Sequence, residues 1–312
     1  LERLRELLHQ SPTVVAWSEL LKELEGGEVG AQEVLMDYLC NHLRAEREAW
    51  VKVAEGLPGL WFKKSVEEEP RLRLWEALGE PEVKMRLVAP GTFMMGSPEN
   101  ELGRDSDEKQ HEVELSKGYW IRRTPVTQAL YEAVMGTNPS FFKGEKKPVE
   151  KVNWLEAVKF CNALSRMEGL EEAYGIEGEN VRWKREANGY RLPTEAEWEK
   201  ACRAGTGEAT YAGNITSEDG VCEVLERVAW YGKNSGGTTK SVGKKAANGL
   251  GLYDMLGNVW EWCWDEYVGD HGSLGRKDPV GGGVNKNSGA KRVIRGGSWG
   301  LSARSCRAGY RH

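Results

Sequence analysis

The chain has 312 residues, of which 39% are apolar and 29% charged, with a formal net charge of −5. This length allows one large core and a smaller one, and so balanced a charge indicates no particular partner. No apolar run approaches the ~20 residues of a membrane helix, and no charged-then-apolar leader opens the chain. Six scattered cysteines without a CxxC pair suit a reducing compartment. We therefore expect a cytoplasmic protein without membrane insertion.

The first 82 residues predict helices. Leucines recur at helical spacing over residues 1–8, and a second stripe over residues 20–24 stops at Gly26. A further apolar stripe runs through residues 34–39, and the pattern ends near Pro81. We interpret residues 1–82 as a small helical N-terminal domain or arm.

From Val83 the pattern changes. Val83–Met95 alternates apolar and polar residues around Pro90, which predicts two short strands. The chain holds 13 tryptophans and 38 glycines, which indicates irregular backbone around an aromatic core. It shows neither helix–strand alternation nor a repeat period, which argues against parallel α/β folds and solenoids.

Two capping boxes predict two helices in this region. Asn153 with Glu156 precedes apolar residues at helical spacing, and Gly169 ends the pattern. Thr194 with Glu197 starts a second helix. Long loops rich in glycine and asparagine follow, and loops of this length usually form functional surfaces or are braced by metal.

Five segments in fixed order carry a resemblance. They are Ala89–Ser97, Thr124–Thr127, Arg191–Glu199, Gly251–Trp262 and Arg295–Trp299. In order and spacing they resemble the formylglycine-generating-enzyme (sulfatase-modifying factor) family, which has a variant of the C-type lectin fold. The resemblance implies an α+β, C-type lectin-like domain over residues 83–312, preceded by the helical domain.

Catalysts of that family bind copper through two cysteines that follow the Gly-Gly-Ser segment. The second position matches Cys306, but the first matches Leu301. A single thiolate cannot hold a cuprous ion as two do. The resemblance therefore implies no copper and no formylglycine formation, and we interpret Cys306 as a packing residue.

A second branch, the sulfoxide synthases, adds a helical partner that supplies a three-histidine iron site. The N-terminal region here has only His9 and His42, which lack the spacing of such a site. Iron chemistry needs several ligands that converge on one ion, so we expect no iron. An oxidative enzyme of either type remains the alternative function.

A third branch comprises the variable proteins of diversity-generating retroelements, which randomise surface residues near the C-terminus to bind new ligands. Mutagenesis there acts at adenines, often in asparagine codons. Five positions could arise from such codons: Gly300, Leu301, Ser302, Ser305 and His312. They interleave with Trp299, Ala303, Arg304, Arg307, Tyr310 and Arg311, which resemble scaffold.

The third branch implies that the chain is not an enzyme but a display protein for an unknown macromolecular ligand, which we expect to be a protein. The expected ligand surface comprises Trp299, Gly300, Leu301, Ser302, Ser305 and His312. The alternative within the family is another catalytically inactive member. Relatives usually continue past this point with a polar loop and a final strand, so either a tail follows His312 or the chain is truncated here.

The C-terminal segment is basic. The last acidic residue is Asp278, and only lysines and arginines carry charge after it. Such a tail can bind nucleic acid. We instead expect its arginines to pair with carboxylates from earlier in the chain, and expect no nucleic-acid partner.

A structural calcium site is implied by the same resemblance. In the family, the segment matching residues 254–261 binds calcium through side chains at the positions of Asp254 and Glu261. Backbone carbonyls at the positions of Gly257 and Val259 complete the set, and calcium prefers such oxygen ligands. In the alternative interpretation the two carboxylates accept hydrogen bonds from loop amides. Abundant Glu, Arg and Leu would also suit a thermostable protein.

Overall fold

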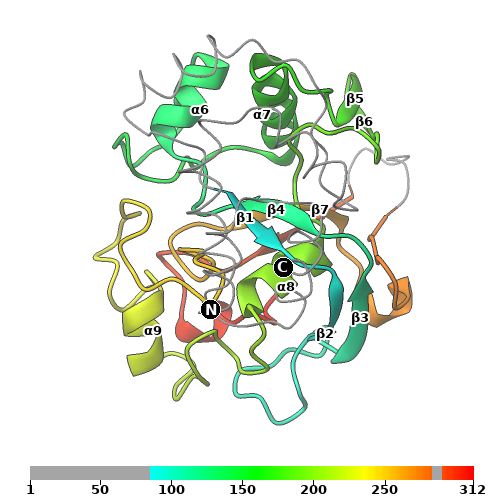
Figure 1. The fold of residues 1–312 in the computed structure, drawn as a ribbon. Coiled ribbons are helices and arrows are strands. Elements are labelled where there is room, and N and C mark those ends of the chain that lie inside the picture. Colours follow the sequence, from blue (N-terminus) through cyan, green and yellow to red (C-terminus); the bar gives the residue numbers. More distant parts are fainter. Residues whose placement is uncertain (1–84, 283–289) are drawn as a thin grey trace, which may run out of the picture.

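A computed structural model describes residues 85–282 and 290–312. The helices expected within residues 1–82 lie outside these ranges. The elements, labelled as in Figure 1, mix helices with short strands, as the predicted α+β fold requires. The strands are β1 (Met85–Val88), β2 (Gly91–Met95), β3 (His111–Leu115), β4 (Tyr119–Arg122), β5 (Tyr174–Glu177), β6 (Asn180–Trp183), β7 (Glu261–Glu266) and β8 (Arg292–Arg295). The helices are α6 (Gln128–Met135), α7 (Trp154–Met167), α8 (Glu195–Arg203) and α9 (Glu223–Val228), with 3₁₀ turns η1 (His271–Leu274) and η2 (Ala303–Ser305).

The strands form four antiparallel pairs: β1 with β4, β2 with β3, β5 with β6, and β7 with β8. The two strands predicted on either side of Pro90 are therefore confirmed as β1 and β2. They do not pair with each other. Gly91 has a φ of +129°, and the turn there sends the chain into a second ribbon.

Both predicted capping boxes are present. The Asn153 side chain accepts the amide of Glu156 while the Glu156 carboxylate accepts the amide of Asn153, and α7 begins there. Thr194 and Glu197 make the same reciprocal pair at the start of α8. These hydrogen bonds satisfy amides that the first turn of a helix leaves without partners.

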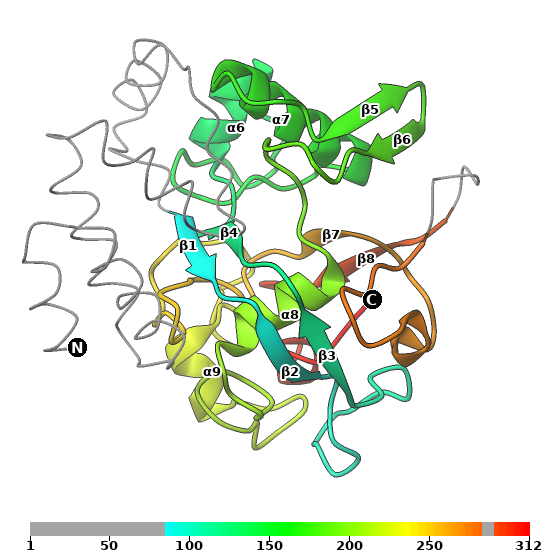
Figure 2. The ribbon, with the colours of Figure 1, turned by 45° about the vertical axis from the view of Figure 1, so that its right-hand side comes forward.

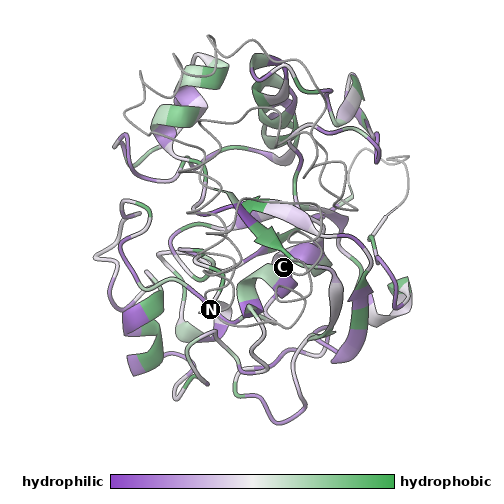
Figure 3. Cartoon of the chain, in the orientation of Figure 1, coloured by the Kyte–Doolittle hydropathy of each residue, from purple (hydrophilic) through white to green (hydrophobic). Residues whose placement is uncertain are grey.

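Helix α8 lies at the centre of the domain. It packs against β2, β3, β7 and β8, whereas α6 and α7 pack against each other and lie to one side with the β5–β6 hairpin (Figures 1 and 2). Hydrophobic and hydrophilic residues alternate along α6 and α7, as in helices that bury one face (Figure 3). Trp198 of α8 is fully buried in the main core.

Aromatic side chains fill a second core, as the tryptophan content predicts. Trp264 contacts the rings of Trp154, Tyr174 and Trp183 at centroid distances of 5.3, 5.1 and 5.5 Å. These rings come from α7, β5, β6 and β7, so they join the β5–β6 hairpin to a helix and to a strand of a separate sheet. Among the residues that the structure describes, no helix is long and apolar enough to cross a membrane.

Candidate functional site

The C-terminal segment is held by buried arginines. Arg295, at the end of β8, is fully buried, and its guanidinium lies 2.7 Å from Glu195 Oε1 and 2.5 Å from Glu199 Oε2. Arg311 donates to both carboxylate oxygens of Glu195 at 2.8 Å. Burial alone would raise the pKa of Glu199, but Arg203 and Arg295 outweigh it and lower that pKa to about 2. Both acids come from α8, so this helix anchors the segment.

Arg307 makes a second buried cluster. Its guanidinium lies 2.7 Å from Glu108 Oε1 and 2.6 Å from Glu101 Oε1, with the arginine and Glu108 fully buried. The expected pairing of tail arginines with earlier carboxylates is therefore confirmed for Arg295, Arg307 and Arg311. Their charges are neutralised internally and do not form a basic surface.

The expected ligand positions divide between surface and interior. Gly300 and His312 are exposed, while Leu301 and Ser302 are partly exposed. Ser305 is only 9% exposed in the turn η2, so we leave it out of the ligand surface. The difference arises because η2 turns its first and last residues, Ala303 and Ser305, toward the core, which a codon pattern cannot show.

Two scaffold assignments also need correction. Arg304 was assigned to the scaffold, but its side chain is 40% exposed and pairs with Asp105 and Glu218, which are themselves partly exposed. Trp299 is half-buried and packs edge-on against Phe142 at 5.1 Å, so it is not a core indole. It lies where ligand surface and scaffold meet.

Two glycines set the path of the segment. Gly296 and Gly297 have φ values of +92° and +75°, a region that favours glycine. A Cβ on Gly297 would lie 2.5 Å from the carbonyl oxygen of Ser305. Beyond this turn the amide of Trp299 donates to Asn258, and the amide of Gly232 donates to the carbonyl of Leu301 at 2.7 Å. The backbone beneath the exposed positions is therefore fixed.

The position of the family's second catalytic cysteine is closed. Cys306 is fully buried, and burial raises the pKa of its thiol to about 12. Leu301 occupies the other position and offers no ligand. The cysteines among the described residues are all free and buried, as expected for packing thiols. Metal binding needs the thiolate, which this environment disfavours.

The candidate calcium residues come together at a buried turn. Asp254 (2% exposed) accepts the amide of Gly243 at 2.6 Å and the side-chain amide of Asn258 at 3.2 Å. Glu261 accepts the indole N–H of Trp198 at 2.6 Å. The contacts of Asp254 are those of the alternative interpretation, in which the carboxylates accept hydrogen bonds from loop amides and bind no metal.

The same two carboxylates nevertheless suit a cation. Burial raises the pKa of Asp254, and burial together with the charge of Asp254 raises that of Glu261 to about 7. No basic side chain contributes to either shift. Within the described residues, the carbonyls of Gly257 and Val259 accept no backbone hydrogen bond. Hard oxygen donors with uncompensated negative charge fit calcium chemically, although no third acid, histidine or cysteine joins them in the described ranges.

We propose that calcium braces this turn. Because the ion would bind only the folded state, it would stabilise that state by RT ln(1 + [L]/Kd). The melting temperature should be higher in millimolar calcium than in chelator, and an Asp254→Asn, Glu261→Gln variant should lose the difference. Equal melting temperatures of the parent protein in the two conditions would refute the proposal.

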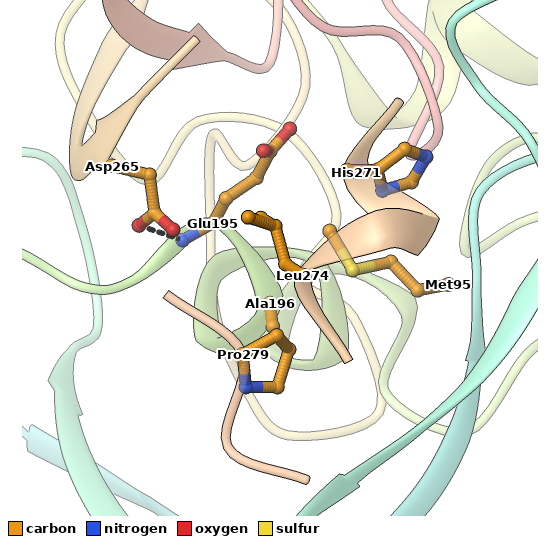
Figure 4. A pocket seen from close by; sticks show the side chains of 7 residues that line it. All are labelled: Met95, Glu195, Ala196, Asp265, His271, Leu274 and Pro279. Carbon is orange, nitrogen blue, oxygen red and sulfur yellow. Dashed lines mark hydrogen bonds between the residues drawn. The ribbon is translucent and has the colours of Figure 1, made fainter. Parts of the chain in front are cut away.

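A small pocket is lined by Glu195 of α8 together with residues from other elements (Figure 4). Asp265 accepts the amides of Glu195 and Gly281 there, and burial with the charge of Glu195 raises its pKa to about 7. Burial lowers the pKa of His271 to about 4. The hydrogen bonds of Asp265 to backbone amides are those of a structural site, and no sequence pattern predicted it. The lining residues are Met95, Glu195, Ala196, Asp265, His271, Leu274 and Pro279.

Known proteins with similar sequence or structure bear several different functional names. The solved structure of Treponema denticola variable protein 1 is similar with a TM-score of 0.65 at 37% identity, over 75% of this chain and 90% of that one. The formylglycine-generating enzyme of Thermomonospora curvata is 32% identical over 222 residues, which are 68% of this chain and 58% of the enzyme. The chaperone protein LppX of Paenibacillus barcinonensis is 40% identical over 181 residues, which are 47% of this chain and 62% of the chaperone.

This chain thus spans less than two thirds of the length of either curated relative. Its residues 76–312 match the family described as the sulfatase-modifying factor enzyme 1-like domain. Together with the mixed helices and short antiparallel strands, this match confirms the predicted C-type lectin-like fold. The chain belongs to the formylglycine-generating-enzyme (sulfatase-modifying factor) family, and its fold is shared with Treponema denticola variable protein 1.

Proposed function

We propose that the chain is a non-catalytic ligand-binding protein whose C-terminal surface residues are diversified by a retroelement. The similarity to Treponema denticola variable protein 1 is the observation that carries the proposal. The alternation along the segment supports it, because buried Arg307 and Arg311 lie between exposed Gly300 and His312. Such a backbone can keep its path while the exposed side chains change.

The proposal makes a genomic prediction. A reverse-transcriptase gene should lie near the coding sequence, with a near-copy of the segment that encodes residues 299–312. The two copies should differ at adenines. Sequencing the locus tests this, and a locus with neither feature would count against diversification.

Substitution of the exposed positions should separate binding from stability. Changing Gly300, Leu301, Ser302 and His312 together to asparagine should shift the free energy of unfolding by about 0.5 kcal/mol per site or less. Binding of peptides selected against the parent from a random phage library should be lost. As a matched control, exposed Glu177 and Asn180 of the β5–β6 hairpin can be changed to Gln and Asp, which should leave binding intact. A loss of several kcal/mol in the Leu301 change alone would mean that this residue is packed inside.

The competing function is oxidation by a formylglycine-generating enzyme, the name that several curated relatives bear. Buried Cys306 and apolar Leu301 argue against it. We expect no conversion of cysteine to formylglycine in a sulfatase-type peptide incubated with the protein, copper and oxygen. Mass spectrometry would show the corresponding mass loss if the chain is an enzyme of this type.

A further inference from the structure

The loop between α6 and α7 is rigidly held beside the ligand segment. Gln128, fully buried in the first turn of α6, donates from Nε2 to the carbonyls of Phe142 and Pro148 at 2.9 and 3.2 Å. Its Oε1 accepts the amide of Gly144 at 3.0 Å. The amide of Phe142 donates to Glu150 at 2.7 Å. One buried side chain thus fixes the loop at three points.

This rigid loop exposes a phenylalanine. Phe141 is 67% exposed. Because the loop is held in place, it cannot rearrange to turn this ring inward. The Phe141 ring contacts that of Phe142 edge-on at 4.9 Å, and Phe142 contacts Trp299 at 5.1 Å. A chain of three rings therefore leads from the exposed Phe141 to the ligand segment. Large exposed aromatic residues at the edge of a binding surface are typical anchors for a partner.

Lysines surround the rings. Lys151 Nζ lies 5.3 Å from the centroid of Phe141, and Lys147 Nζ lies 5.7 Å from that of Phe142. Lys143 and Lys146 are exposed on the same loop. Of the two acids between residues 143 and 151, Glu150 is engaged by the amide of Phe142.

A second basic stretch borders both this loop, where the amide of Val242 donates to the carbonyl of Lys146, and the ligand segment. The stretch 227–253 contains no aspartate or glutamate. It touches the segment where the amide of Gly232 donates to Leu301, and there Lys245 Nζ lies 4.0 Å from the ring of Trp230. The tail arginines pair with carboxylates, but Lys143 and Lys151 form no ion pair with a carboxylate in the part of the chain that the structure describes. Their charge is therefore available to a ligand.

We propose that this aromatic ledge, defined as Phe141, Phe142 and Trp299 with Lys143, Lys146, Lys147 and Lys151, is the fixed half of the ligand surface. Its partner would be a protein whose contacting loop places Asp or Glu side chains around an apolar residue. The proposal rests on the display function, and adds to it an anchor outside the diversified segment. The apolar residue would pack on Phe141, and the carboxylates would meet the lysines.

A single-stranded nucleic acid is negatively charged, as the proposed acidic partner is, but it binds aromatic rings in a different geometry. Bases stack on open aromatic faces. Here lysine ammonium groups lie over Phe141 and Phe142, and the three rings meet edge to face. This arrangement favours an apolar anchor with a charged rim, as at protein interfaces.

The test uses peptides selected from a random phage library against the full chain. We expect the selected peptides to be enriched in Asp and Glu near an apolar residue, and their binding to weaken with added salt. Phe141→Ala should weaken binding by about tenfold or more, as expected of an interface anchor. A Lys143→Gln, Lys151→Gln variant should reduce the salt dependence. Val221→Ala is the matched control, because Val221 is also 67% exposed but precedes α9.

The outcomes separate the ledge from the display function. If the changes at Gly300, Leu301, Ser302 and His312 abolish binding and Phe141→Ala does not, the ledge proposal is wrong and the display function stands. If neither set affects binding, both are wrong. Selected peptides without acidic enrichment would overturn the choice of partner. So would a labelled oligothymidine that binds more tightly than the peptides and is released by Phe141→Ala.

Discussion

Replacing Arg307 with alanine is expected to lower the free energy of unfolding by about 3–5 kcal/mol, the usual cost of breaking a buried ion pair. The guanidinium is fully buried and lies 2.8 and 2.7 Å from the two carboxylate oxygens of Glu108. Its removal would leave Glu108 and Glu101 without their cation in the interior, where an unpaired charge is costly. Urea denaturation of the variant, monitored by tryptophan fluorescence, measures the difference.

The neighbouring Arg304 provides the matched control. It lies three residues earlier, but its side chain is 40% exposed and its partners Asp105 and Glu218 are 37% and 41% exposed. Exposed ion pairs contribute about 0–1 kcal/mol, so Arg304→Ala should be nearly neutral. Equal losses in both variants would show that the segment depends on charge in general and not on the buried cluster.

The contrast between these arginines also shows what sequence alone can predict. The capping boxes at Asn153 and Thr194 depend on residues three apart, so the sequence was sufficient to place both helix starts. The burial of Arg307 depends on Glu108, 199 residues away. Nothing local distinguishes it from Arg304, and we assigned both residues to the scaffold.

The position of the ligand surface in the chain could be predicted from the sequence, but the burial of its individual residues could not. The resemblance located the segment, and exposed Gly300 and His312 agree with a surface role. It could not show that Ser305 faces inward. It also missed Phe141, because no sequence pattern says that a phenylalanine is exposed. The one available signal was a pair of consecutive phenylalanines directly after Pro139 and Ser140, in a loop and not in a periodic element.

Replacing Gly297 with alanine is the second change with a large expected effect. The residue has a φ of +75°, which costs an L-residue about 1–2 kcal/mol. A Cβ there would also lie 2.5 Å from the carbonyl oxygen of Ser305 and 2.8 Å from Cys306 Sγ. Overpacking of this kind typically costs a further ~1–3 kcal/mol. We therefore expect the free energy of unfolding to fall by about 2–5 kcal/mol.

Gly300, three residues later, should respond in the opposite direction. No atom lies within 4 Å of a Cβ built on it, and its φ is not in the left-handed region. Gly300→Ala should therefore leave stability unchanged or raise it by up to about 1 kcal/mol, because alanine restricts the unfolded chain. Thermal and urea denaturation of the two variants measure both values. A display segment requires this difference, since the turn at Gly297 must hold its path while position 300 accepts any side chain. Similar losses at both glycines would mean that position 300 is also part of the scaffold, and that the segment could not tolerate diversification there.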